Sequence, residues 1–182
     1  ESLRDGEYDF ESCLAESQDV AALPFWPECY RQWFPTMLAD EPHGSAESHQ
    51  RAGFDRTIHL AGSKLARVDE KVRWRNRKTG KVYGDILLET VSNVQWQAPG
   101  WVCKELLADY IAYAIAPLGK AYLLPVLQLQ ATWRKCGIAW TANSRVVTSH
   151  SSSRGRHWTT QSVPVPVDVL FSAIGGLLRA TF

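Results

Sequence analysis

The clearest regularity in the chain is an alternation of apolar and polar residues in its middle part. Residues 54–60 alternate, and after a turn at residues 61–64 the alternation resumes over residues 65–74. Side chains that alternate with a period of two lie on opposite faces of a β-strand. A hairpin loop at residues 76–80 leads to a third strand over residues 82–91. The pattern therefore predicts an antiparallel meander of three strands.

The segments on either side of this meander carry other patterns. Helices are predicted over residues 5–17, 24–39, 101–109, 125–136 and 169–178, the second of them ended or kinked at Pro35. Strands are predicted over residues 110–116, 121–124 and 163–167, the last at a sheet edge because two prolines interrupt it. Residues 40–49 indicate a loop or the start of a short helix, and residues 141–157 indicate a basic loop. Strands mixed with later helices favour an α/β or α+β fold.

The charges of the chain are distributed unevenly. The formal net charge is +1, yet residues 1–47 contain eleven acidic and two basic residues. Residues 48–182 contain eighteen basic and eight acidic residues. The length of 182 residues fits one domain with a sizeable core, so we expect a single domain, 1–182, with an acidic helical N-terminal part and a basic core. Such an asymmetry is typical of a protein with a polyanionic partner.

Two acidic residues and a lysine in the basic part have the spacing of a hydrolytic metal site. Asp55 begins the first predicted strand, and Asp69 and Lys71 lie on one face of the second because they are two residues apart. Two carboxylates and an ammonium group can therefore converge. Hydrolysis of a phosphodiester uses a divalent metal ion with hard oxygen ligands, and a nearby lysine can orient the attacking water. The backbone carbonyl of Glu70 is a further candidate ligand.

The segment Asp55…Val68-Asp69-Glu70-Lys71 resembles the PD-(D/E)xK nuclease superfamily, which includes type II restriction enzymes, Holliday-junction resolvases and phage exonucleases. This resemblance implies a restriction-endonuclease-like fold, with a mixed central sheet flanked by helices, and DNA cleavage that depends on Mg²⁺ or Mn²⁺. Asp55 matches the first metal ligand, Asp69 the second and Lys71 the catalytic lysine. Glu47 is the candidate for a further acid that superfamily members place on the preceding helix.

Phe54 stands where the motif has a proline. Longer runs, among them Tyr83-Gly84-Asp85-Ile86-Leu87-Leu88-Glu89 and Thr160-Gln161-Ser162-Val163-Pro164-Val165-Pro166, are similar to uncharacterised proteins of phages and prophages. Those proteins bring no established activity with them. The functional prediction therefore rests on the arrangement of the two acids and the lysine. We expect a Mg²⁺-dependent phosphodiesterase that acts on DNA and is associated with a phage or prophage.

Basic residues surround this motif. Residues 64–81 contain eight of them, opposed only by Asp69 and Glu70, and no acidic residue occurs between Asp109 and Asp168. Phosphate contacts dominate nucleic-acid affinity, so these stretches are expected to bind the DNA backbone. The candidate nucleic-acid contacts are Arg73, Arg75, Arg77, Lys78, Lys81, Arg154 and Arg156.

Simpler explanations exist for the same residues. Asp69 and Lys71 would form ion pairs on a solvated strand face, and basic residues on a hairpin also oppose edge-to-edge pairing of sheets. A nuclease fold without activity is another interpretation. The main alternative function is a non-catalytic phage accessory protein of nuclease-like fold, which binds nucleic acid or a host protein through the same surface.

The sequence also bears on location and assembly. No apolar run approaches the roughly 18 residues of a membrane helix, so we expect a soluble protein with no membrane partner. The expected location is the cytoplasm of a bacterial or phage-infected cell. Many members of the nuclease superfamily dimerise to cut both strands, which makes a homodimer possible here.

Overall fold

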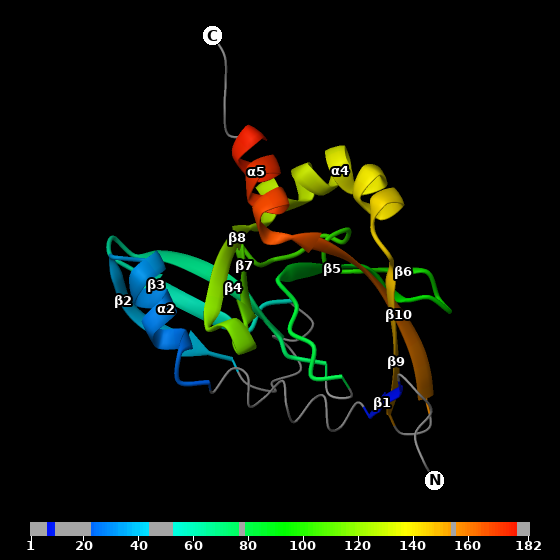
Figure 1. The fold of residues 1–182 in the computed structure, drawn as a ribbon. Helices are drawn as coiled ribbons and strands as arrows, with labels where there is room; N and C mark the ends of the chain where they lie inside the picture. The colour runs from blue at the N-terminus through cyan, green and yellow to red at the C-terminus, as the bar shows by residue number, and fades with distance from the viewer. Residues whose placement is uncertain (1–6, 10–22, 44–52, 77–78, 154–155, 178–182) are drawn as a thin grey trace. The chain divides into compact units, whose positions relative to one another are not determined.

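The computed structural model describes residues 7–9, 23–43, 53–76, 79–153 and 156–177, in two compact units (Figure 1). The mixed-sheet unit comprises Glu16–Tyr83 and Leu106–Val126, and the hairpin unit comprises Glu1–Ala15, Gly84–Glu105 and Leu127–Phe182. The described residues form a mixed α+β structure with two sheets and three helices, which confirms the predicted fold class in outline. A single domain over the whole chain stays a prediction. No described helix is long and apolar enough to cross a membrane.

The mixed-sheet unit contains five strands in the order β2-β3-β4-β7-β8. They span Met37–Pro42, Arg56–Leu60, Lys64–Arg73, Tyr110–Ile115 and Lys120–Pro125, respectively. β3 pairs antiparallel with both β2 and β4, whereas β4 pairs parallel with β7. A short 3₁₀ turn, Ala116–Leu118, then leads into β8, which pairs antiparallel with β7. The parallel pair of β4 and β7 is what makes this sheet mixed.

Helix α2 (Trp26–Trp33) covers one face of this sheet (Figure 1). Trp26, Tyr30 and Phe34 recur every four residues, so their side chains lie along one side of the helix and the residue that ends it. They pack against small and β-branched side chains of the sheet, namely Ile58, Ala66, Val68, Ala112 and Ala114. The helix predicted over residues 24–39 is confirmed only for α2, with Pro27 in its first turn and Pro35 after its end, because residues 37–39 belong to β2.

The hairpin unit is built on a second sheet. Its strands are β1 (Glu7–Asp9), β5 (Asp85–Asn93), β6 (Ala98–Pro99), β9 (Val147–Ser153) and β10 (Arg156–Pro166), and its helices are α4 (Val126–Asn143) and α5 (Val167–Leu177). β9, β10, β5 and β6 are antiparallel neighbours in that order, and β1 pairs parallel with β9. Pro164 and Pro166 lie where β10 pairs only with β5, which confirms the predicted edge locally.

Several predicted elements are wrong. The third strand of the predicted meander is β5, which pairs with β10 and β6, while the second neighbour of β4 is β7. Residues 101–109 form turns rather than a helix, residues 40–42 belong to β2, and most of the predicted basic loop forms β9 and the start of β10. Glu7–Asp9 is a strand, and the other residues of the helix predicted over 5–17 lie outside the described residues.

Candidate functional site

The β3–β4 hairpin determines which site residues share a face. Its register pairs Arg56 with Val68, and the amide of Asp55 donates to the Val68 carbonyl at 2.8 Å, just before β3 begins. Side chains alternate along β4, so Asp69 and Lys71 lie on one face and Glu70 on the other. The face opposite α2 therefore carries Asp69 and Lys71, as the sequence pattern predicts.

The carboxyl groups of Asp55 and Asp69 meet on this face. Burial, together with the charge of Asp55 and a side-chain hydrogen bond to it, raises the pKa of Asp69 to about 7, although the Lys71 ammonium opposes the shift. The side chain of Asp69 is only 8% exposed. The two acids that the sequence places fourteen residues apart are thus close enough to share a proton or a cation.

Lys71 completes the group. Its Nζ donates to Asp69 Oδ1 at 2.6 Å, and its side chain is 33% exposed. An ammonium carries three N–H donors, so it can contact Asp69 and a second acceptor together. Lys71 therefore presents positive charge at the border between a buried acid and solvent.

A backbone contact ties Asp55 to β4. The Glu70 amide donates to Asp55 Oδ2 at 2.8 Å, and this amide belongs to the residue between Asp69 and Lys71. Alternate residues of a strand direct their backbone groups to the same neighbour, and the Val68 carbonyl is also directed to this side. The carbonyl of Glu70 is expected on the same side of β4 as its amide.

The oxygen atoms of Asp55, Asp69 and the Glu70 carbonyl are suitable ligands for a divalent cation. Carboxylate and carbonyl oxygens are the ligands that Mg²⁺ takes, and a cation between Asp55 and Asp69 would offset their mutual repulsion. Among the described residues, no group of three or more His, Cys, Asp or Glu side chains is arranged to bind a metal ion. Glu47 lies outside the described residues, and the carboxylate of Glu70 lies on the opposite face. Glu70 can therefore contribute only through its backbone.

The opposite face of the hairpin holds a polar cluster that sequence reasoning missed. Arg56 Nε donates to Glu70 Oε1 at 2.7 Å, Tyr30 OH donates to the same oxygen at 2.6 Å, and Arg56 also pairs with Asp40. The guanidinium carbon of Arg56 lies 5.3 Å from the centroid of the Tyr30 ring. We call Arg56, Glu70, Tyr30 and Asp40 the Arg56 cluster.

Burial dominates the electrostatics of this cluster. The side chains of Arg56 and Glu70 are 3% and 2% exposed. Burial raises the pKa of Glu70, although Arg56 and the hydrogen bond from Tyr30 act in the other direction. Burial, the charge of Glu70 and the hydrogen bond to it also raise the pKa of Tyr30 above its ordinary range. The one signal in the sequence is that Arg56 and Glu70 stand on the otherwise apolar face of the alternating pattern.

The predicted nucleic-acid contacts fall into two groups. Arg73, at the end of β4, lies 4.5 Å from the Tyr83 ring centroid, Lys81 lies 5.3 Å from the same centroid, and Arg75 is exposed between them in the chain. These three residues belong to the mixed-sheet unit, as do the site acids. Arg77, Lys78 and Arg154 lie outside the described residues, and the side chain of Arg156 is not described.

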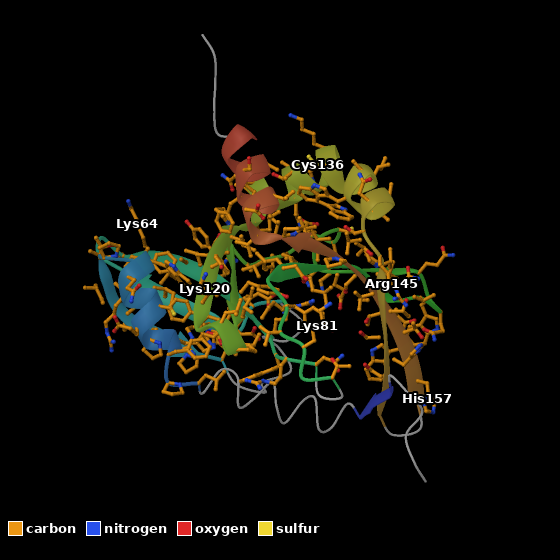
Figure 2. All side chains as sticks on the ribbon, in the orientation of Figure 1. Lys64, Lys81, Lys120, Cys136, Arg145 and His157 are labelled. Atoms are coloured by element: carbon orange, nitrogen blue, oxygen red, sulfur yellow. The ribbon has the colours of Figure 1, made fainter. Side chains whose placement is uncertain are left out.

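Figure 2 shows Lys81 and Lys64 at separate places on the mixed-sheet unit. Lys64 begins β4 and Arg73 ends it, so the basic residues around Tyr83 lie at the opposite end of the strand from Lys64.

Comparison of the chain with protein-family profiles, curated proteins and solved structures gave no match. The resemblance to the nuclease motif therefore rests on the site residues themselves.

Proposed function

We propose that the mixed-sheet unit carries the active site of a divalent-metal-dependent phosphodiesterase that acts on DNA. The observation that supports this proposal best is the convergence of Asp55 and Asp69 on one face, with Lys71 Nζ 2.6 Å from Asp69 Oδ1. A mixed sheet covered by α2 on its other face agrees with a restriction-endonuclease-like core. The phage or prophage setting remains part of the proposal.

Asp55, Asp69 and the carbonyl of Glu70 are the residues that would bind Mg²⁺ or Mn²⁺. When bound, such an ion stabilises negative charge on a phosphate and lowers the pKa of a bound water. The burial of Asp69 keeps bulk water from competing for its oxygens. Lys71, with part of its side chain exposed, donates hydrogen bonds to the attacking water or to a phosphate oxygen, which orients the one and neutralises the other.

DNA is the proposed substrate because basic residues accompany the site. Arg73, Arg75 and Lys81 lie in the same unit, and the ring of Tyr83 supports two of them through cation–π contacts. Arg75 and Lys81 are exposed, so their charges are accessible to phosphates.

The direct test is cleavage of a supercoiled plasmid and of a single-stranded oligonucleotide with Mg²⁺ or Mn²⁺. The wild type is compared with Asp69→Asn and Lys71→Ala, and with Glu28→Gln as a control, because Glu28 is 64% exposed on α2. We expect both site variants to lose at least about 100-fold in rate, as is usual for groups that act on the transition state. Equal cleavage by all four proteins would indicate a contaminating enzyme or another site.

The second candidate is a non-catalytic accessory protein that binds DNA or a host protein through this surface. The 2.6 Å contact between Lys71 and Asp69 agrees with this candidate too, since an ion pair of this kind also exists without any catalytic role. DNA binding without cleavage, with no effect of Mn²⁺ on protein stability, would support this candidate and contradict the nuclease.

A further inference from the structure

The Arg56 cluster connects four elements behind the proposed metal site. Tyr30 comes from α2, Asp40 from β2, Arg56 from β3 and Glu70 from β4. Arg56 is the centre, because it contacts Glu70 through Nε and Asp40 through a terminal nitrogen while it lies over the Tyr30 ring. A guanidinium is a planar fork of donors, so it fixes the relative positions of its partners better than a flexible ammonium does.

The cluster and the site share a backbone. Arg56 directly follows Asp55, and Glu70 stands between Asp69 and Lys71. Each acid of the site is therefore one residue away from a member of the cluster, on the other face of the same hairpin. The Glu70 residue is the direct link, because its side chain accepts from Arg56 and Tyr30 while its amide donates to Asp55 Oδ2 at 2.8 Å.

We propose that Arg56 is a positioning residue for the metal site, acting through Glu70: the fixed Glu70 side chain orients its own backbone, whose amide places the Asp55 carboxylate opposite Asp69. This inference rests on the proposed function for its catalytic consequence. It names no new ligand, since the Arg56 side chain lies on the face opposite Asp69.

A role in stability alone explains the cluster poorly. Taking a guanidinium and a carboxylate out of water costs much of what their attraction returns, and apolar side chains of similar volume often stabilise a core as well or better. Glu70 Oε2 is buried without a hydrogen-bond partner among the described residues, which is a further cost. The hydrogen bonds of the cluster do something that apolar packing does not: because they are directional, they restrict the geometry of the backbone behind the site.

The test compares two changes in the full chain. Arg56→Met combined with Glu70→Leu replaces the buried pair by apolar side chains, and Glu41→Gln is a matched control. Glu41 belongs to the same pair of strands as Asp40, but its side chain is exposed and lies within hydrogen-bond distance of His59. The readouts are Mn²⁺ affinity, measured by the electron paramagnetic resonance signal of free Mn²⁺, and hydrogen exchange of the residue-70 amide, measured by NMR.

We expect the double variant to fold, to bind Mn²⁺ at least about tenfold more weakly and to exchange the residue-70 amide at least about tenfold faster, as loss of a supporting contact does at other metal sites. Glu41→Gln should stay within about threefold of the wild type, because it leaves the whole cluster in place. A folded double variant with wild-type Mn²⁺ affinity and wild-type amide protection would overturn the inference and leave a purely structural cluster.

Two further comparisons cover the cases in which the double variant does not fold or the wild type does not bind Mn²⁺. If the double variant does not fold, Arg56→Lys takes its place, because an ammonium keeps the positive charge but lacks the planar fork that contacts Glu70 and Asp40 together; unchanged amide exchange and Mn²⁺ affinity in Arg56→Lys would then overturn the inference. If the wild type itself does not bind Mn²⁺, the proposed metal site is wrong, and exchange of the residue-70 amide alone decides whether Arg56 positions Asp55.

Discussion

The amide of Glu70 donates to Asp55 Oδ2 at 2.8 Å, so a side chain at the start of β3 is bonded to the backbone of β4 between the two other site residues. This contact closes the end of the β3–β4 hairpin where the regular ladder stops. It also orients the Asp55 carboxylate toward the face of Asp69. One hydrogen bond thereby joins the secondary structure to the proposed chemistry.

Substitutions of Asp55 should separate its role in folding from its role in metal binding. Asp55→Asn keeps an oxygen that accepts from the Glu70 amide, whereas Asp55→Ala leaves that amide without this acceptor. We expect Asp55→Ala to lower the free energy of unfolding by about 1–2 kcal/mol more than Asp55→Asn. Urea denaturation at pH 7 measures the difference. Equal stability of the two variants would show that the contact contributes nothing to the fold.

The stability of the protein should depend on the ionisation of Asp69. Its pKa is raised from 3.8 in a free side chain to about 7, so the fold favours the protonated form. The contribution of Asp69 to the free energy of unfolding is therefore fully present below about pH 4 and is lost as the pH rises through 7, because the native state binds more protons than the unfolded state. Asp69→Asn is always neutral and escapes this loss.

The measurement compares urea denaturation of the wild type and Asp69→Asn at pH 5 and pH 8. The free energy of unfolding of Asp69→Asn relative to the wild type should increase by about 2 kcal/mol between these pH values. Any constant effect of losing the Lys71 contact cancels in this comparison. Parallel pH profiles of the two proteins would contradict the burial of an ionisable Asp69.

A divalent cation should stabilise the folded protein through the same acids. At a Mn²⁺ concentration about 100 times the dissociation constant, linkage gives about 2.7 kcal/mol, which corresponds to a rise in Tm of roughly 5–10 °C for a chain of this size. Asp55→Ala and Asp69→Asn should abolish the rise, and Glu28→Gln should keep it. Differential scanning fluorimetry with and without Mn²⁺ provides the test, and an equal rise in all variants would indicate binding elsewhere.

The basic residues beside Tyr83 should contribute to DNA affinity through phosphates. Arg75→Ala and Lys81→Ala are each expected to weaken binding to any DNA sequence and to reduce the slope of log K against log salt by about 1. Lys64→Ala is the matched control, because Lys64 is exposed at the opposite end of β4. Fluorescence anisotropy with a labelled duplex at several salt concentrations measures the slopes. Identical slopes for all three variants would contradict the proposed DNA contact.

Gly100 in the hairpin unit should tolerate no side chain. A Cβ at this position would lie 2.2 Å from the carbonyl oxygen of Glu89, far inside van der Waals contact. We expect Gly100→Ala to destabilise the protein by about 3 kcal/mol or more, because backbone rather than a flexible side chain must move. Gly175 is the control, since a Cβ there meets nothing within 4 Å and alanine is the better helix former in α5. Thermal unfolding of the two variants should shift in opposite directions.

The sequence predicts the site hairpin well because its determinants are local. Alternation over a few residues assigns Asp69 and Lys71 to one face, and the proline positions locate α2. The partners of the strands are not local properties. Nothing near β5 indicates that it pairs with β10 rather than β4, and nothing near β7 indicates a parallel position beside β4.

Other differences have chemical causes. The strand β9 and the start of β10 are rich in Ser, Thr and His, so they lack the apolar alternation that identifies a half-buried strand, although Thr favours extended backbone. The Arg56 cluster escaped prediction because a charged residue among apolar ones is read as exposed unless its partners are known. Tyr30 lies forty residues before Glu70, and no pattern in the sequence joins them.

The position of β7 has a consequence for the order of folding. The β3–β4 hairpin brings Asp55 and Asp69 together across a short loop and can form early, whereas β4 meets β7 only through pairs such as Asp69 with Ile111, forty-two residues apart. Contacts of such long sequence separation form late, because the chain loses more entropy in closing the larger loop. On the ribosome, the two acids would therefore be made and paired well before the strand that completes their sheet has been synthesised.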